Sequence, residues 1–287
     1  MKKRIVLCAD DYGQALPISN AIHDLVRNQR LTAVSCLVNE GEWQSQALAL
    51  KEYHSKIDLG LHFNLTQGLA VSKEYQSFYG IHFKPLSHVI LKSLSRQWRS
   101  DILEYECHAQ IDAFSAQMGF LPDFLDGHQH IHLFPVIRDV IFKVYQDRLR
   151  SNHTYMRLSE DHTPSFDLAT KYKKTIIKFL NGRHIKNQLL DKKVIYNQSF
   201  AGIYPFQRAV HYRRFFLKFL GSIKTNGIIM CHPGYQQESS SKDEIADARY
   251  HEFQYFSSDH FQEDCEDTGV SLARFDRMLL KSHNVLL

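Results

Sequence analysis

Short apolar runs alternate along this chain with longer segments in which apolar residues recur every three or four positions. The short runs predict strands, and the longer periodic segments predict helices. The predicted strands cover residues 4–9, 33–38, 57–62, 122–126, 154–158 and 227–232. The predicted helices cover residues 17–28, 42–54, 99–119, 136–149 and 206–221. This alternation is typical of parallel strands joined by crossover helices, in a (β/α) barrel or in a doubly wound sheet.

Two stretches interrupt the alternation, at residues 67–98 and 160–197. We interpret both as insertions or lids, because no repeat, low-complexity tract or linker divides the chain. A (β/α) barrel of about 250 residues folds as a single domain, so the length of 287 residues fits one barrel with insertions. The expected organisation is therefore a single domain over residues 1–287.

Side chains that can bind a metal occur where four of the predicted strands end. They are Asp10 and Asp11 after residues 4–9, His62 at the end of 57–62, His128, His130 and His132 after 122–126, and His232 at the end of 227–232. Because ligands bind at the carboxyl ends of parallel strands, these side chains are expected on one face of the fold. Taken singly, an aspartate pair is typical of a turn or helix cap, and a lone histidine of a structural role. Their shared position favours a metal site.

Local geometry decides how many of these side chains reach one ion. In a strand, the three histidines of residues 128–132 would share a face, whereas in a turn only some of them would converge. Cys231 next to His232 could suggest a nucleophile and its base. Neighbours in a strand point to opposite faces, however, so Cys231 is predicted to be a small core residue.

Composition and charge narrow the class of protein. The chain is 44% hydrophobic and 23% charged, which is typical of globular proteins. Its net charge of +4 is too small to indicate a nucleic-acid partner. The five cysteines are scattered without a Cys-x-x-Cys spacing, and the first apolar run stops at Asp10, so neither a disulfide framework nor an export signal is expected. Since no apolar run reaches the ~18 residues of a spanning helix, we predict a cytoplasmic protein.

Residues 171–193 carry eight Lys or Arg residues against one Asp. Apolar residues such as Ile177 and Phe179 interleave there with Lys173, Lys174 and Lys178. A basic amphipathic helix can lie on an anionic membrane or meet an anionic lipid-linked sugar. We prefer a solvated helix that packs on the barrel, with peripheral membrane contact through residues 171–193 as the alternative. Whether the chain forms a homodimer is left open.

Five motifs occur in the order and with the residues of a known family. They are Ala-Asp-Asp-Tyr-Gly at 9–13, Val-Asn at 38–39, Gly-Leu-His-Phe-Asn-Leu-Thr at 60–66, Asp-Gly-His-Gln-His-Ile-His-Leu-Phe-Pro at 126–135 and Met-Cys-His-Pro-Gly at 230–234. Arg157, Arg249 and Glu252 also match family positions. On these residues the chain resembles the YdjC-like carbohydrate deacetylases, which include chitooligosaccharide deacetylase and a hopanoid-biosynthesis branch.

This resemblance implies an α/β fold, a distorted, incomplete (β/α) barrel of the polysaccharide-deacetylase type. It implies an enzyme that removes an N-acetyl group from an amino sugar or oligosaccharide. The implied cofactor is a divalent ion, Mg²⁺ in most members, held by Asp11, His62 and His128. Asp10 would be the base that activates water, and His232 an acid or a hydrogen-bond donor to the transition state.

Further residues receive supporting roles. His130 and His132 would orient the ligands or contact the sugar. Arg157 and Asn39 are also candidates for substrate-binding or supporting residues. The chain departs from the chitooligosaccharide branch at Gln129, where that branch carries a third histidine, and from the family generally in the two insertions.

The ligand set leaves alternatives for both metal and reaction. Two imidazoles and one carboxylate favour Zn²⁺, Mn²⁺ or Ni²⁺ on donor softness, whereas Mg²⁺ prefers oxygen ligands. The same triad occurs in non-haem iron oxygenases, although the strand–helix alternation disfavours them here. A deacetylase of a lipid-linked sugar at the membrane surface and a non-enzymatic carbohydrate-binding module are the remaining alternatives.

Overall fold

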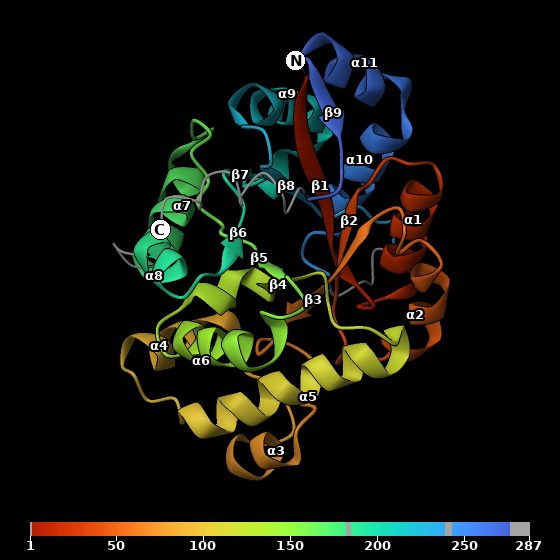
Figure 1. Ribbon diagram of the computed structural model, residues 1–287. Coiled ribbons are helices and arrows are strands. Elements are labelled where there is room, and N and C mark those ends of the chain that lie inside the picture. Colours follow the sequence, from red (N-terminus) through yellow and green to blue (C-terminus); the bar gives the residue numbers. More distant parts are fainter. Residues whose placement is uncertain (1, 182–184, 239–242, 276–287) are drawn as a thin grey trace.

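The computed structural model describes residues 2–181, 185–238 and 243–275 (Figure 1). Its strands form one sheet in which each pairs in parallel with its neighbours, in the order β6-β5-β4-β3-β2-β1-β8-β7, with β9 also paired to β1. The strands are β1 Lys3–Tyr12, β2 Ala33–Cys36, β3 Asp58–Phe63, β4 Phe124–Gly127, β5 Tyr155–Met156, β6 Ile195–Tyr196, β7 Phe200–Ala201, β8 Ile228–Cys231 and β9 Val270–Leu272. The parallel strands predicted from the alternation are confirmed.

The two edges of this sheet, β6 and β7, are neighbours in the sequence. Tyr196 and Phe200 are so close along the chain that the segment between them spans at most about 14 Å. The sheet must therefore curl until its edges approach each other, and a bridge from Asp161 to Phe200 helps to join them. Among the described residues no strand pairing joins β6 to β7. The expected distorted, incomplete barrel is confirmed.

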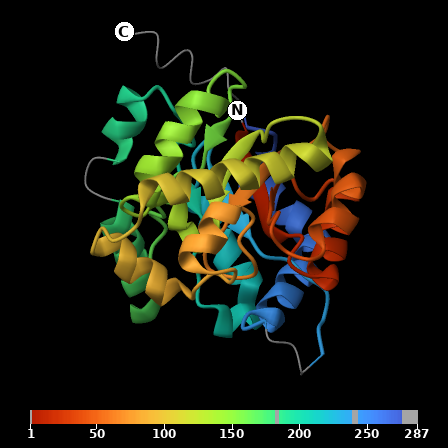
Figure 2. The same ribbon diagram turned by 90° about the horizontal axis from the view of Figure 1, so that it is seen from below.

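Helices lie around the outside of the curled sheet, and α5 runs across the molecule with α3 beside it (Figures 1 and 2). The α-helices are α1 Leu16–Arg27, α2 Trp43–Lys51, α3 Lys73–Tyr79, α4 Leu86–Leu94, α5 Ser100–Met118, α6 Ile137–Val144, α7 Leu168–Asn181, α8 Ile185–Asp191, α9 Tyr212–Ser222, α10 Ala246–Ser257 and α11 Asp259–Asp267. Short 3₁₀ segments, η1 His128–Leu133 and η3 Phe206–His211, and a π-helical turn, η2 Tyr145–Leu149, complete the set. The predicted helix at 206–221 therefore begins as a 3₁₀ turn.

Alternation along the strands separates an outer core from the barrel interior. On β1, Ile5, Leu7 and Ala9 belong to the large core under the helices, whereas Val6 and Cys8 belong to a second, inner cluster. Side chains two residues apart share a face. The same inner face continues at the strand ends with Asp10 after Cys8, His62 after Gly60, Asp126 after Phe124, Arg157 after Tyr155 and His232 after Met230.

The two predicted insertions differ in their relation to the sheet. Residues 67–98 hold α3 and α4 outside the barrel. Residues 160–197 hold α7 and α8 but end in β6, so their last residues belong to the sheet and the predicted boundary was too wide. The assignment of residues 1–287 to one domain stays a prediction.

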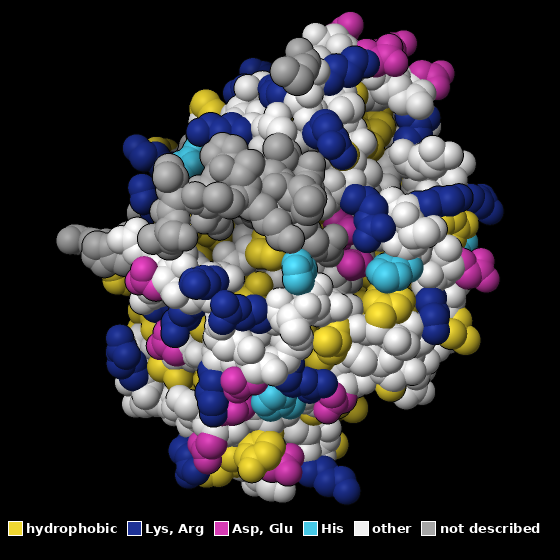
Figure 3. Space-filling view, in the orientation of Figure 1, with side chains coloured by type: hydrophobic (Ala, Val, Ile, Leu, Met, Phe, Trp, Pro, Cys, Tyr) yellow, Lys and Arg dark blue, Asp and Glu magenta, His cyan; other side chains and the backbone are white. Residues whose placement is uncertain are grey.

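Two surface features bear on the predicted partners. Among the described residues, no helix is both long and apolar enough to cross a membrane. On the face shown in Figure 3, Lys and Arg side chains are interspersed with Asp and Glu.

Candidate metal and catalytic site

The three predicted metal ligands come together at the carboxyl ends of β1, β3 and β4. Asp11, His62 and His128 are all buried, and each offers one ligand atom within 4.8 Å of the other two. Asp11 Oδ1 lies 3.4 Å from His62 Nε2 and 3.1 Å from His128 Nδ1. One carboxylate oxygen and two imidazole nitrogens at these distances fit a divalent ion, and as donors they suit a transition metal.

A β-bulge allows two consecutive aspartates to face the interior. The register between β1 and β2 shifts between Ala9 and Tyr12, and Asp11 has a φ of 71°. Neighbouring residues of a regular strand point to opposite faces, so the bulge is what brings both Asp10 and Asp11 to the site. The sequence analysis placed this pair after the strand, and that was wrong, because β1 continues through the bulge to Tyr12.

A buried carboxylate that the sequence analysis did not single out supports His62. Asp126 lies opposite His62 in the β3–β4 register. Its Oδ1 is 2.6 Å from His62 Nδ1 and accepts a 2.5 Å hydrogen bond from the hydroxyl of Ser35. With its Nδ1–H donated to Asp126, His62 keeps Nε2 for a metal, the usual carboxylate–histidine–metal arrangement.

The same carboxylates make His62 a position for positive charge. Burial opposes a charge on this imidazole, but Asp126, Asp10 and Asp11 outweigh burial and raise its pKa to about 10. A divalent ion bound at Nε2 would take the place of that proton as the compensating charge. The electrostatics of the cluster, like its donor atoms, therefore fit a cation.

Arg157 is the counterion of two carboxylates. Its Nη1 and Nη2 lie 2.7 and 2.8 Å from the two oxygens of Asp10, and Nη1 lies 2.9 Å from Asp126 Oδ2. Burial disfavours the charge, yet Asp10 and Asp126 raise the pKa of Arg157. At 1% exposure the guanidinium does not reach a sugar, so of its two expected roles the structure supports the supporting one. Its bidentate pair fixes the orientation of Asp10.

A second buried arginine holds the ligand Asp11. Arg249 of α10 donates to Asp11 Oδ2 at 2.8 Å and to Asp243 at 2.6 Å. Burial would raise the pKa of Asp11, but Arg249 and His128 lower it well below its usual range. Asp11 is therefore ionised at neutral pH, with Oδ1 toward the histidines. Arg249 was noted in the sequence only as a family match, since no local pattern links it to Asp11.

His232 follows β8 and lies beside the aspartates. Its ring packs edge-on against Phe206, with centroids 5.4 Å apart. Burial lowers the pKa of His232 to about 4, against the opposing effects of Asp11 and Asp10. The imidazole is neutral at pH 7 in this structure, which favours the hydrogen-bonding role among the two that were expected for it.

Glu252 fixes the backbone beside His232. Its carboxylate accepts a 2.5 Å hydrogen bond from the backbone N–H of His232 and a 2.6 Å hydrogen bond from the hydroxyl of Tyr204. Burial raises the pKa of Glu252 to about 7, although these two hydrogen bonds lower it in part. The end of β8 is thereby tied to α10.

The three histidines of residues 128–132 do not converge. Gln129 and His130 have φ values of 54° and 64°, so η1 is a tight turn in which only His128 contacts Asp11. His130 is buried and packs edge-on against Phe200, 5.8 Å between ring centroids. Of the two geometries left open by the sequence, the turn is the one formed.

His132 has a supporting position below the site. It is fully buried, and its Nε2 lies 2.7 Å from the backbone carbonyl of Arg157. This position favours the orienting role among the two that were expected for it. His132 holds the residue that orients Asp10.

Asn39 follows β2 and belongs to an amide network that joins its loop to the loop after β3. Its side chain donates to the Gln67 carbonyl at 3.1 Å and accepts from Asn64 at 3.0 Å. Gln67 in turn donates to Glu40 at 3.1 Å, and burial raises the pKa of that carboxyl group. These contacts give Asn39 a role in shaping the loop.

Comparison with known proteins adds sequence relatives and a fold match. A family model described as "YdjC-like protein" matches residues 4–267. The chain is 33% identical over 156 residues to a carbohydrate deacetylase of Danio rerio, covering 51% of this chain and 47% of that protein. It is 27% identical over 150 residues to a chitooligosaccharide deacetylase of Salmonella typhimurium, covering 52% and 58% of the two chains. The matches thus span about half the length of these curated relatives.

One solved structure has the same fold over nearly the full length. It is a protein of Enterococcus faecalis V583 whose proposed activity is cellobiose-phosphate cleavage. The TM-score is 0.66 at 16% sequence identity, and the match covers 97% of this chain and 99% of that one. At this identity the likeness concerns the fold alone.

Proposed function

The chain belongs to the YdjC-like family, and from this premise we propose that it is a metal-dependent hydrolase that removes an N-acetyl group from an amino sugar or oligosaccharide. One observation carries the proposal: Asp11, His62 and His128 offer three buried ligand atoms to one ion. Relatives named carbohydrate deacetylase and chitooligosaccharide deacetylase support the reaction class. The whole site lies at the carboxyl ends of the strands, where such barrels bind ligands.

A divalent ion held by Asp11, His62 and His128 would act as a Lewis acid and lower the pKa of a bound water. The donor set suits Zn²⁺ or Mn²⁺ better than the Mg²⁺ that the family resemblance implies. We therefore propose a transition metal first, and Mg²⁺ as the alternative to be tested beside it.

Asp10 is the proposed general base. Both of its oxygens are fixed by Arg157, and Oδ2 lies 3.9 Å from His62 Nε2, the proposed ligand atom. A carboxylate held beside the metal ligands can accept the proton of an attacking water through its remaining lone pairs. Its pairing with Arg157 keeps Asp10 from rotating away.

His232 is the proposed hydrogen-bonding partner of the reacting amide. A neutral imidazole can donate from one nitrogen as negative charge develops on the substrate, and can accept a proton at the other. The Phe206 ring beside it shields that hydrogen bond from water.

Three parts of the wider prediction remain proposals. An N-acetylated sugar is the proposed substrate, with a lipid-linked sugar as the alternative. The cytoplasm is the proposed compartment. Peripheral membrane contact, a homodimer and an oxygenase with the same ligand triad are alternatives for which the described structure offers no separate support.

Acetate release from a panel of N-acetylated sugars and glycolipids tests the reaction, with metal-free protein and protein reloaded with Zn²⁺, Mn²⁺ or Mg²⁺. Asp10→Asn should keep the metal and lose turnover by roughly 10²–10⁴, the usual contribution of a general base. Asp11→Asn should lose the metal. Asp139→Asn, on the exposed surface of α6, is the control and should change neither. Metal loss in Asp10→Asn with metal retention in Asp11→Asn would reverse the two roles. Turnover that depends on oxygen would contradict the hydrolase and favour an oxygenase.

A further inference from the structure

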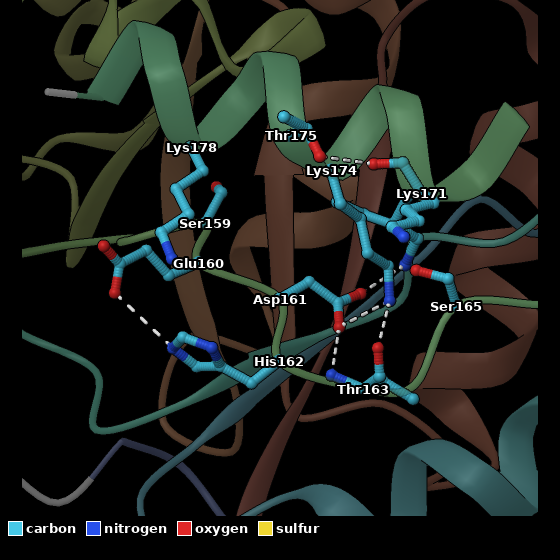
Figure 4. A pocket seen from close by; sticks show the side chains of 11 residues that line it. Ser159, Glu160, Asp161, His162, Thr163, Ser165, Lys171, Lys174, Thr175 and Lys178 are labelled. Carbon is cyan, nitrogen blue, oxygen red and sulfur yellow. Dashed lines mark hydrogen bonds and ion pairs between the residues drawn. The ribbon is translucent and has the colours of Figure 1, made fainter. Parts of the chain in front are cut away.

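Helix α7 carries four of the eight basic residues of residues 171–193, and these lysines do not share one environment. Lys174 is half-buried, with 9% of its side chain exposed, and donates to Asp161 Oδ1 at 2.9 Å and to the Thr163 carbonyl at 2.8 Å. Lys171, Lys174 and Lys178 line a separate cavity of about 170 Å³ beside residues 159–165 (Figure 4). Lys174 is therefore tied to the fold, which corrects its expected place on a membrane-facing or solvated surface.

Lys173 lies on a different side of α7. Thr170, Ile177 and Leu180, at helical spacing from it, are buried, whereas Lys173 itself is exposed. Lys173 therefore lies in line with the stripe that packs toward the barrel, without being covered by it. Along this stripe α7 contacts η1, the turn that carries His128. Although Lys173 is exposed, its ammonium points toward Phe206 and so toward the site.

The ammonium of Lys173 lies close to the proposed catalytic side chains. Its Nζ is 5.0 Å from the centroid of the Phe206 ring, and that ring packs against His232. Its charge also lowers the pKa of His130 and that of His232, although burial is the larger cause for both. Both effects place the ammonium near these two histidines.

This cation has no acidic partner among the residues that the structure describes. The carboxylates of the site are already compensated, Asp10 by Arg157 and Asp11 by Arg249. The pKa of Lys173 is lowered by nearby protein atoms and raised by no carboxylate, so the ammonium stands beside the site without a counterion. Such a cation is free to pair with a negative charge that arrives with the substrate.

We propose that Lys173 is a substrate-binding residue and that its ammonium binds an anionic group, a phosphate or a carboxylate, on the N-acetylated sugar. This inference rests on the proposed deacetylase function and narrows its substrate class. The ammonium fixes the acidic substituent over Phe206, while the acetamide lies against His232 and the metal ligands. Selectivity for acidic sugars therefore comes from residues 160–197 and the chemistry from the strand ends.

The test compares kcat/KM of the metal-loaded full chain on N-acetylglucosamine, N-acetylglucosamine 6-phosphate and N-acetylmuramic acid. The parent should prefer at least one of the two acidic sugars, and their order distinguishes phosphate from carboxylate. Lys173→Gln should reduce kcat/KM for that sugar by about 10- to 100-fold, mainly through KM, and reduce kcat/KM for the neutral sugar by much less. Lys173→Arg should restore most of the preference. Lys171→Gln, the same charge change on the exposed side of α7, is the matched control and should have little effect.

Two outcomes would overturn the inference: a parent that prefers the neutral sugar, or equal losses in Lys173→Gln and Lys171→Gln. If no sugar releases acetate, the proposed function fails for this panel. A measurement of sugar binding then tests separately whether Lys173 binds an anion. Glucose 6-phosphate, glucuronate and glucose contain no acetamide, so they bind without turnover. Tighter binding of either anion than of glucose, lost in Lys173→Gln but kept in Lys171→Gln, would uphold the anion site, and equal binding of all three sugars would remove it.

Discussion

Replacing Asp126 by Asn tests whether the carboxylate behind His62 sets the affinity for metal. Asp126 Oδ1 accepts from Ser35 and contacts His62, and Oδ2 contacts Arg157. Asn offers one oxygen and one NH₂ group in place of two oxygens. Whichever way the amide is turned, its NH₂ group meets N–H or O–H donors in a fully buried place.

The structure allows a magnitude for this change. Loss of the partner behind a ligating histidine typically weakens metal binding by about 10- to 100-fold, which is roughly 1.4–2.7 kcal/mol. A buried donor left without an acceptor costs about 1–3 kcal/mol. We therefore expect the free energy of unfolding of the metal-free variant to fall by a similar amount.

The assay is the Kd for Zn²⁺ and Mn²⁺, measured by competition with a chromophoric chelator, together with urea unfolding of the metal-free protein. Ser35→Ala is the matched control, because it removes a hydrogen bond to the same Oδ1 and introduces no new donor. It should weaken metal binding less than Asp126→Asn does. A folded Asp126→Asn variant that binds both ions as tightly as the parent would refute the reasoning.

Three further predictions concern stability. Gly60→Ala should lower the free energy of unfolding by about 1–3 kcal/mol, because the new methyl would lie 2.4 Å from the ring of Phe124. Gly221→Ala is the control, since open space surrounds that position. Equal urea midpoints for the two variants would contradict the packing argument. The pKa of Glu252 is about 7 in the folded protein, above its usual 4.5, so the folded state holds the proton more tightly. The free energy of unfolding should therefore fall by up to about 3 kcal/mol as pH rises from about 4.5 to 7. Glu252→Gln should abolish this fall, and unfolding curves of parent and variant at pH 5 and 8 check it, since an equal fall in both would contradict the role of Glu252. Lys174→Met should lower the free energy of unfolding by about 3–5 kcal/mol, because it leaves the buried carboxylate of Asp161 without its cation. Lys178→Met, on the exposed side of α7, should lower it little. Similar losses in both variants would show that the ion pair is not the cause.

The parts of the fold that follow from local pattern could be predicted from the sequence. Residues 5–9 are all apolar, so β1 was visible as an apolar run, as was the order of strands and helices. The bulge at Asp11 was not, because a positive φ at a non-glycine residue depends on the strands that pack around it. His62 and His232 lie on the expected face, because each comes at the end of an apolar run that the sequence marked as a strand.

Contacts between distant segments are what the sequence could not supply. Asp126 was quoted only as part of a motif, and its contact with His62 requires the register between β3 and β4. Arg157 gave no sign that it would be buried between two carboxylates. Lys173 and Lys174 are adjacent and chemically identical, yet the turn of α7 directs one to the site and the other to Asp161.

The unpaired seam between β6 and β7 has a consequence for how such a protein can diversify. A closed barrel transmits a change in any strand around its whole circumference, whereas a barrel interrupted at one place can lengthen, shorten or exchange the segment there with little cost to the rest. Helices α7 and α8 are inserted next to that seam, whereas β1 and β3, which carry Asp10, Asp11 and His62, lie near the middle of the strand order. Natural selection can thus vary substrate recognition and the reaction independently, and so can an engineer who exchanges residues 160–194 between relatives.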